Sequence, residues 1–237
     1  MTNLKEIIYK RKSTRKYDMT PLDAKTLADI QNFVAKAKPL YNGIKVEFEI
    51  IDGNNIKGMF AIKAPHYMII RSETEENYLV NAGFMLQQAD LYLQSMGFGS
   101  CWLGMAKPAE KPENNLEYVI MLAFGKPLGS PHRDLSGFKR KPLSQISDIS
   151  DHRLEPARLA PSGINSQPWF FVSYNNIIHV YCVKHGAVKN LIYKRLNKID
   201  MGIALAHLFL VCERFKFFAV QSPMYVKGHY YIGSVEV

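Results

Sequence analysis

The stretch that decides the fold is Ala160-Pro161-Ser162-Gly163-Ile164-Asn165-Ser166-Gln167-Pro168-Trp169, called here the proline–serine loop. Two prolines and a glycine shape its backbone, and the side chains of Ser162, Asn165 and Gln167 offer neutral hydrogen-bond donors and acceptors. Such groups suit the edge of a planar heterocycle. The alternative interpretation is an ordinary turn before a strand, because the loop leads into an apolar run.

The residues around this loop predict an α+β segment. We expect weakly helical stretches before it, and two strands, a long apolar helix and a last strand after it. In order, these elements are the helices at Pro142–Ser150 and Arg153–Leu159, the strands at Trp169–Tyr174 and Ile177–Val183, the helix at Leu191–Phe215 and the strand at Tyr230–Val235.

The chain before residue 125 repeats this order of elements. Apolar spacing predicts helices at Leu4–Lys10, Pro21–Lys36 and Asn77–Met96, and strands at Val46–Ile50, Tyr67–Ile70 and Tyr118–Phe124. Gly125–Pro142 is rich in glycine, proline and basic residues, which favours a connection between two halves.

An internal repeat links the two long helices. Asn81-Ala82-Gly83 opens the first and Asp200-Met201-Gly202 opens the second, and a strand is expected after each helix, at Cys101-Trp102-Leu103 and at Ala219-Val220. We interpret the chain as two related halves, residues 1–128 and 129–237, packed as an internal pseudo-dimer. Chance recurrence of a common element order is the alternative.

A glycine-rich segment, Gly97-Phe98-Gly99-Ser100-Cys101-Trp102-Leu103-Gly104, follows the first long helix. Three glycines in eight residues let the backbone approach a flat ligand closely. The pattern is not a glycine fingerprint that opens a helix, so it does not predict a dinucleotide-binding βαβ fold.

Two short basic clusters could hold an anion. The first is the basic loop Arg11-Lys12-Ser13-Thr14-Arg15-Lys16-Tyr17, and the second is Lys139-Arg140-Lys141. Arginine, serine and backbone N–H groups supply the converging donors that a phosphate needs. Solvated surface charge is the alternative for either cluster alone.

Composition excludes several other classes of protein. The chain has 237 residues, 47% hydrophobic and 22% charged, and no apolar run long enough for a membrane span. The first 15 residues lack the apolar core of a secretory signal, so we expect a cytoplasmic protein. The three cysteines, Cys101, Cys182 and Cys212, fit reduced thiols, and the histidines show no metal-binding spacing.

Together these motifs resemble the FMN-dependent nitroreductase family. That family carries a basic-Ser-basic loop of the form R-x-S-x-R-x-aromatic, the motif A-P-S-x-x-N-x-Q-P-W and a glycine-rich segment over the flavin. The order differs here, because the intact A-P-S motif lies in the second half, while the first half has only Ala37-Lys38-Pro39-Leu40-Tyr41-Asn42 in its place. The chain is therefore similar to a single-chain, fused version of the family's dimer, with a mostly antiparallel sheet flanked by helices.

The resemblance assigns cofactor roles by position. It implies a phosphate site on Arg11, Lys12, Ser13, Lys139 and Arg140, of which the two lysines are the weaker candidates. Arg15 would lie near the N1/O2 edge of the ring, where a cation stabilises the charge of a reduced flavin. The remaining cofactor-binding candidates are Cys101, Trp102, Leu103, Gly104, Pro161, Ser162, Gly163, Asn165 and Gln167.

The same resemblance implies one complete site in each chain. A mirror site would need a basic loop where Asp148 and Asp151 stand, and glycines where Phe215-Lys216-Phe217-Phe218 stand. We therefore expect the mirror site to be inactive and the chain to be a monomer that contains its own pseudo-dimer.

Three functions remain open. The first is an FMN oxidoreductase that takes hydride from NAD(P)H and reduces nitroaromatics or quinones by a ping-pong mechanism, without a catalytic side chain. The second is a flavin-binding or flavin-handling protein without turnover. The third is a nucleic-acid binder, suggested by the net charge of +9 but not supported by any recognition motif.

Overall fold

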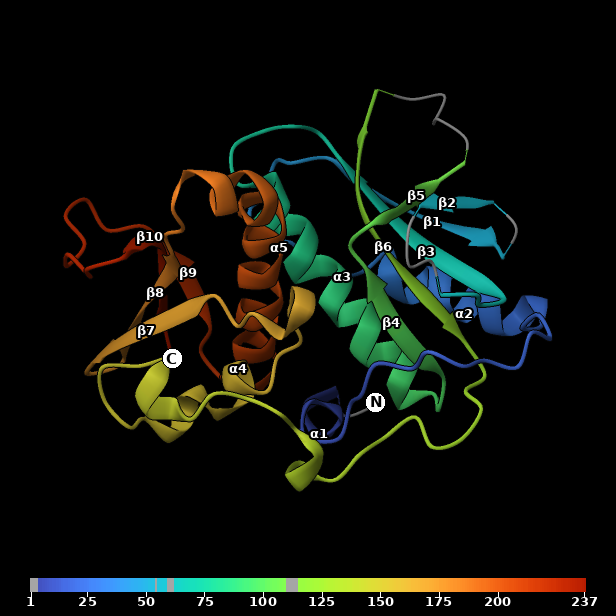
Figure 1. The fold of residues 1–237 in the computed structure, drawn as a ribbon, viewed down its shortest axis with the longest axis horizontal. Helices are drawn as coiled ribbons and strands as arrows, with labels where there is room; N and C mark the ends of the chain where they lie inside the picture. Colours follow the sequence, from blue (N-terminus) through green and yellow to red (C-terminus); the bar gives the residue numbers. More distant parts are fainter. Residues whose placement is uncertain (1–3, 54, 59–61, 110–114) are drawn as a thin grey trace.

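The computed structural model describes residues 4–53, 55–58, 62–109 and 115–237 (Figure 1). The first half starts with two helices, α1 (Leu4–Ile8) and α2 (Ala24–Val34). A sheet and a long central helix follow: β1 (Val46–Asp52), β3 (His66–Ser72), α3 (Tyr78–Ser95), β4 (Gly99–Leu103) and β6 (Glu117–Gly125). A small antiparallel ribbon is formed by β2 (Ile56–Gly58) and β5 (Ala106–Pro108).

The second half contains the same succession of strands and long helix. Its elements are β7 (Trp169–Tyr174), β8 (Ile177–Val183), α5 (Ala187–Val211), β9 (Lys216–Phe218) and β10 (His229–Glu236). Before them come the short helix α4 (Glu155–Arg158) and 3-10 turns at Leu135–Gly137, Leu143–Gln145 and His152–Leu154, and a further turn at Gly163–Asn165 lies between α4 and β7.

Both halves build their sheets in the same way. The strand order is β1-β3-β6-β4 in the first sheet and β7-β8-β10-β9 in the second, and every pairing is antiparallel. In chain order each sheet is strand, strand, long helix, strand, strand. The internal repeat predicted from the sequence is thus present in the topology as well as in short motifs.

The two long helices cross between the sheets at a pair of glycines (Figure 1). A Cβ atom on Gly83 of α3 would lie 2.2 Å from the backbone oxygen of Ile199, and one on Gly202 of α5 would lie 2.0 Å from that of Val80. Each glycine therefore faces the residue three positions before the other glycine. This reciprocity is what a two-fold axis between related halves produces.

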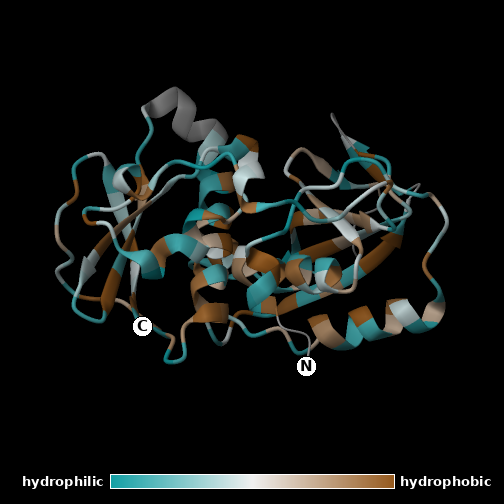
Figure 2. Cartoon of the chain, turned by 90° about the horizontal axis from the view of Figure 1, so that it is seen from below, coloured by the Kyte–Doolittle hydropathy of each residue, from teal (hydrophilic) through white to brown (hydrophobic). Residues whose placement is uncertain are grey.

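One core joins the halves. A single cluster of buried side chains runs from the first sheet through α3 and α5 into the second sheet, with Met68, Leu122, Leu205 and Val180 among its members. Figure 2 shows that apolar segments lie along the central helices and strands, while the peripheral loops are mostly hydrophilic. Neither half has a separate core of comparable extent in the described part of the chain.

The structure confirms the α+β class, the antiparallel pairing and the two related halves. The sheet, however, is divided into one sheet for each half, with the helix pair between them. The second long helix ends at Val211 rather than at Phe215, because Cys212 already has an extended backbone (ψ 127°). The strand expected at Ala219-Val220 lies at Lys216–Phe218, and Pro142–Ser150 forms a 3-10 turn instead of a helix. The boundary between residues 128 and 129 stays a prediction.

Candidate functional site

The basic loop (residues 11–17) is extended and lies against two other segments. Ser13 forms a bridge with Ser100 of β4, and Arg11 forms a bridge with His132 in the connection (residues 125–142). Glycine is required at position 99, because a Cβ there would lie 2.5 Å from Thr14 Oγ1. The loop is therefore held between the glycine-rich segment and the connection.

Arg11 is the centre of the site. Its side chain is fully buried, and its Nε lies 3.0 Å from Oδ2 of Asp90 on α3. Its Nη1 and Nη2 atoms are also buried, yet they have no hydrogen-bond partner among the described residues. Buried guanidinium groups are normally paired, because an unmet charged donor is costly. The geometry thus leaves two strong donors without an acceptor among the described residues.

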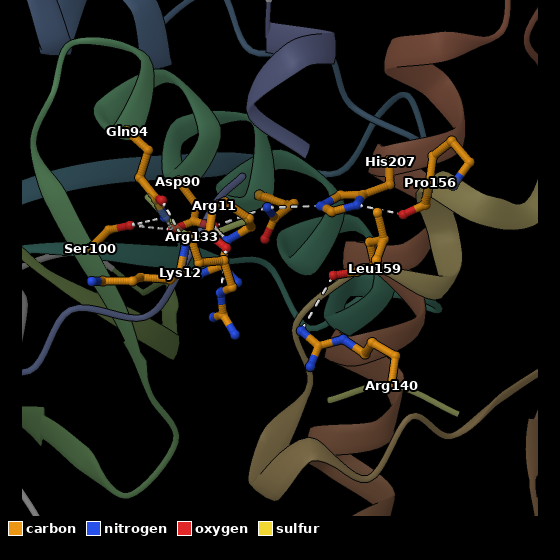
Figure 3. Close-up of polar contacts among 11 residues, drawn as sticks. Arg11, Lys12, Asp90, Gln94, Ser100, Arg133, Arg140, Pro156, Leu159 and His207 are labelled. Atoms are coloured by element: carbon orange, nitrogen blue, oxygen red, sulfur yellow. Dashed lines mark hydrogen bonds and ion pairs between the residues drawn. The ribbon is translucent and has the colours of Figure 1, made fainter. Parts of the chain in front are cut away.

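Asp90 is saturated by other contacts. Its Oδ2 also accepts from Gln87 Nε2 at 3.0 Å, and its Oδ1 accepts from the Ser100 hydroxyl (Figure 3). Gln94 Nε2 donates to the same hydroxyl at 2.8 Å. With its oxygens filled, Asp90 fixes the position of Arg11 but cannot satisfy all of its donors.

His207 of α5 extends this network into the second half. Its Nδ1 lies 2.8 Å from the backbone oxygen of Pro156 and must donate, so the unprotonated Nε2 accepts from Gln87 Nε2 at 3.2 Å. Burial lowers the pKa of His207 to about 3, and the charge of Arg11 adds to this effect. His207 is therefore neutral, and it links the two halves through hydrogen bonds alone.

Two arginines of the connection converge on Arg11. Arg133 Nε donates to the backbone oxygen of Arg11 at 3.0 Å, and the Phe138 ring packs 4.7 Å from the Arg133 guanidinium and 5.7 Å from that of Arg140. Burial lowers the pKa of Arg140 to about 10, and the charges of Arg11 and Arg133 contribute. Among the described residues, no carboxylate contributes to the pKa of either Arg133 or Arg140. Asp90 therefore compensates Arg11, while the charges of Arg133 and Arg140 are not compensated by any described carboxylate.

The proline–serine loop meets this cluster. Arg140 Nη1 donates to Asn165 Oδ1 at 2.7 Å, and Asn165 Nδ2 donates to the backbone oxygen of Lys139 at 2.9 Å. Arg140 Nη2 reaches the backbone oxygen of Leu159 at 3.3 Å, while its buried Nε has no hydrogen-bond partner among the described residues (Figure 3). Arg140 therefore connects the cationic cluster to the loop of the second half.

The glycine-rich segment approaches the same loop across α5. A Cβ on Gly104 would lie 3.2 Å from Leu196 Cδ2, and one on Gly163 would lie 3.7 Å from Leu196 Cδ1. Trp102, half-buried on β4, has a buried Nε1 without a hydrogen-bond partner in the described part of the chain. Backbone from both halves thus borders one region that contains an unpaired indole donor.

Comparison with known proteins identifies the family of the chain. A family model described as "Putative TM nitroreductase" matches residues 3–212. The chain belongs to this nitroreductase family. No curated protein matches the sequence significantly.

The chain is also similar to solved structures, of which the first described here shows the fold. A putative nitroreductase from Thermotoga maritima is 21% identical, with a TM-score of 0.68, and the match covers 99% of this chain and 93% of that chain. A nitroreductase family protein from Clostridium novyi is 23% identical over 55% of this chain and 88% of that one, with a TM-score of 0.45. An FMN-dependent nitroreductase from Clostridium difficile is 19% identical over 52% and 87%, with a TM-score of 0.42. The first match shows that the whole chain adopts the fold of a single nitroreductase chain.

The candidate residues of this nitroreductase-family chain fall into two groups. Those around the cluster lie at one junction: Arg11, Ser13, Trp102, Gly104, Arg140, Gly163 and Asn165. Arg15 is exposed, but its charge acts on the nearby Arg133 and Cys101. Pro161 is buried in the same loop, and Ser162 Oγ accepts from the Gln167 backbone N–H at 2.9 Å.

Several other candidates already form contacts within the protein or are buried on β4. Gln167 Oε1 accepts from the Lys141 N–H at 2.8 Å, and Lys12 N–H donates to Gln94 at 3.0 Å. Cys101 and Leu103 are buried on β4, and burial raises the pKa of the Cys101 thiol. Lys139 is exposed, and its backbone oxygen rather than its ammonium takes part in the loop contacts. Their contact with a cofactor stays a prediction.

Asp90, Arg133 and His207 belong to the site but were not predicted from the sequence. A signal existed for His207, because it lies within the otherwise apolar run Ile203–Val211. Arg133 lies in the basic connection but outside the cluster that we selected. Among the described residues there is no group of side chains that could hold a metal ion, and no helix long and apolar enough to span a bilayer.

Proposed function

We propose that this protein is an FMN-dependent oxidoreductase with its cofactor at the junction just described. The observation that carries the proposal is the fully buried Arg11, whose two terminal nitrogens have no hydrogen-bond partner among the described residues. It lies close to Arg133 and Arg140, and no carboxylate of those residues acts on the pKa of either. A phosphate monoester has the charge and the number of acceptor oxygens to satisfy such donors. The residues present therefore fit the phosphate end of FMN.

The phosphate would be held by three guanidinium groups. Arg11 would donate from Nη1 and Nη2, which Asp90 leaves free, while Arg140 would contribute its unpartnered Nε. Arg133 adds charge from the other side, and Ser13 adds a hydroxyl from the basic loop. These cations repel one another without an anion, so cofactor binding would relieve the depression of the pKa of Arg140 and Arg133.

The ring would lie between the glycine-rich segment and the proline–serine loop. Trp102 Nε1 and the backbone beside Gly104 supply donors on the first side, and Pro161 with Ser162 borders the second. The exposed Arg15 would stabilise negative charge at the pyrimidine edge of the ring. When bound, FMN would supply the hydride chemistry that links NAD(P)H to an electron-poor acceptor.

The rim of this region favours a flat apolar acceptor. Met105 and Ile164 are 57% and 77% exposed, and they follow the two glycines that border Leu196. Exposed apolar side chains clustered beside a candidate site suit aromatic substrates such as nitroaromatics or quinones. Nicotinamide would occupy the same position before the acceptor, which requires the two substrates to bind in turn.

The test is a spectrum followed by a titration. We expect purified protein, or protein reconstituted with FMN, to show the absorption band of oxidised flavin at about 450 nm. Anaerobic NADH or NADPH should bleach this band, and a quinone or nitroaromatic should restore it. Arg11→Ala should weaken FMN binding about 10- to 100-fold, because hydrogen bonds to charged groups contribute about 1.5–3 kcal/mol.

Arg153→Ala is the matched control. Arg153 is also an arginine of the chain's basic surplus, but it pairs with Asp151 at 2.8 Å and reaches the backbone oxygen of Asn175. It should leave FMN affinity unchanged. A yellow protein that no nicotinamide reduces would indicate flavin binding without turnover, and a protein that takes up no FMN at all would refute the proposal.

A further inference from the structure

A buried carboxylate lies beneath the proline–serine loop. Asp200 of α5 is 4% exposed, and both of its oxygens accept from the Gly163 backbone N–H, at 3.0 and 3.2 Å. The Ser166 hydroxyl donates to Oδ2 at 3.4 Å. Asp200 therefore anchors the loop at two residues, Gly163 and Ser166.

The loop that Asp200 anchors is strained. Ile164, Asn165 and Gln167 all have left-handed backbone conformations, with φ of 47°, 59° and 49°. This region is unfavourable for residues other than glycine, and most of all for a β-branched residue such as Ile164. A conformation of this kind persists only where its surroundings hold it, and such strain tends to occur at functional sites.

The counterpart of Asp200 in the first half of the chain is Asn81 of α3. Asn81 lies two residues before Gly83, just as Asp200 lies two residues before Gly202. Its Oδ1 accepts from the N–H groups of Leu40 and Tyr41 at 2.9 and 3.0 Å. A neutral amide thus anchors the counterpart loop, and the ionisable side chain stands only on the half whose loop reaches the arginine cluster.

We propose that Asp200 is a positioning residue that holds the proline–serine loop in its strained shape for the cofactor, and that loss of the proton from its carboxyl group loosens this hold. The inference rests on the proposed function only for the identity of the ligand. The loop covers Asp200, so burial disfavours the ionised carboxylate, and the hydrogen bonds from Gly163 and Ser166 offset only part of this cost. Opening the loop would let water reach the carboxylate, so loop order, and with it cofactor affinity, should decrease as Asp200 loses its proton.

The burial of Asp200 is expected to bring its change of protonation close to neutral pH. Burial raises the pKa of Asp200 to about 7, against the opposing hydrogen bonds from Gly163 and Ser166. The titratable group that faces Asp200 is Cys182 on β8, which in turn faces Lys198 and the Tyr230 hydroxyl. Burial raises the pKa of Cys182 to about 12, so this thiol stays neutral while Asp200 titrates.

The first measurement needs no cofactor. Amide exchange of Gly163, followed by NMR and corrected for the intrinsic exchange rate, should show a protection factor that falls about three- to tenfold between pH 6 and pH 8. In Asp200→Asn, which copies the arrangement of Asn81, the protection factor should stay constant. A constant protection factor in the unsubstituted chain would overturn the proposal, whether or not the variant folds.

The second measurement is FMN affinity over the same pH range. The ratio of the dissociation constants of Asp200→Asn and the unsubstituted chain cancels the ionisation of the FMN phosphate and of Arg140, which both proteins share. That ratio should change about three- to tenfold between pH 6 and pH 8, and Asn81→Asp should not change the affinity at all. A ratio independent of pH contradicts the role of Asp200. Failure of every protein to bind FMN would instead contradict the proposed function and leave the amide-exchange result to decide the role of Asp200.

Discussion

The two ends of the α3–α5 pair have the same architecture and different chemistry. At one end the proline–serine loop faces the glycine-rich segment, across Leu196. At the other end the counterpart loop, residues 37–42, faces β9, and the Tyr41 ring packs edge-on against Phe217 at 5.4 Å. Where the first junction has an exposed glycine, the second is filled by aromatic side chains.

The difference extends into the helices. Asp90 is seven residues after Gly83, and the residue seven after Gly202 is Phe209. Asp90 belongs to the polar network around Arg11, whereas Phe209 packs against Phe84 and Phe215 with ring centres 5.3 Å apart in both cases. A duplicated scaffold can thus keep one polar junction for binding and convert the other into core. This supports our prediction of one active site in each chain.

The helix crossing is common to both ends, so a change there should have the largest effect. In Gly202→Ala the new Cβ would lie 2.0 Å from the Val80 backbone oxygen and 2.6 Å from the Phe84 nitrogen. Backbone atoms cannot move aside as side chains can, so we expect a loss of more than about 3 kcal/mol or no folded protein. Thermal and urea unfolding would measure it.

Gly186→Ala is the control for this change. No heavy atom lies within 4 Å of the position where its Cβ would be, and its φ of −60° suits alanine. Its stability should differ by less than about 1 kcal/mol. Equal stability of the two variants would mean that the helices do not cross as closely as described.

Removal of the charge at Asp90 should have the next largest effect on stability. This effect should be confined to the end of the helix pair that carries the proline–serine loop, called here the polar end; the end with Tyr41 and Phe217 is called the aromatic end. Asp90→Asn would leave the buried Arg11 without its counter-charge, which typically costs about 3–5 kcal/mol. FMN should restore part of this stability, because its phosphate would compensate the guanidinium. Unfolding with and without FMN would check both statements.

Asp29→Asn serves as the comparison for Asp90→Asn. Asp29 pairs with Lys25 on the exposed face of α2, so its removal should have little effect in either condition. If FMN stabilised the Asp90 variant no more than the unsubstituted chain, Arg11 would not face the cofactor.

Local sequence patterns predict the long apolar helices, the alternating strands and the position of the proline–serine loop. The three-residue strands β2 and β5 were not predicted, and β9 was expected three residues too late in the chain, because so short a strand carries no periodicity. The division into two sheets depends on which strands pair, and strand pairing is a long-range property.

The candidate site shows the same limit. Arg11, Arg140 and Asn165 were selected from motifs, and the structure brings them to one junction. Arg133 and His207 act through partners far away in the sequence, so no local pattern marks their roles. A polar residue inside an apolar run, such as His207, indicates a buried polar contact but does not identify its partner.

Asp200 should give the polar end a dependence of stability on pH. Its pKa is raised from 3.8 to about 7 in the folded chain, so the folded state binds a proton more tightly than the unfolded state between those values. The free energy of unfolding should therefore be highest near pH 4, fall as the pH rises to 7 and then level off. The total decrease due to this group should be at most about 4 kcal/mol.

Substitutions at both ends can isolate this contribution. Asp200→Asn should lack the decrease, so the variant should become more stable relative to the unsubstituted chain as the pH rises. Asn81→Asp should introduce a second decrease, since the position beneath the counterpart loop is also buried. Parallel stability curves for the unsubstituted chain and Asp200→Asn would show that this carboxyl titrates at its ordinary pKa.

The smallest effect should come from the aromatic end. Tyr41→Ala removes the edge-on contact with Phe217 and part of a half-buried side chain, which should cost about 1–2 kcal/mol of stability. FMN affinity should not change, because Tyr41 lies on the counterpart loop. Asn165→Ala is the matched change on the proline–serine loop: it frees Arg140 Nη1 from its 2.7 Å contact, and it should weaken FMN binding about three- to tenfold with little loss of stability. The two variants should thus separate stability from affinity. If Tyr41→Ala lowered FMN affinity as much as Asn165→Ala, the aromatic end would be a second binding site, and the contrast between the two junctions would be one of degree.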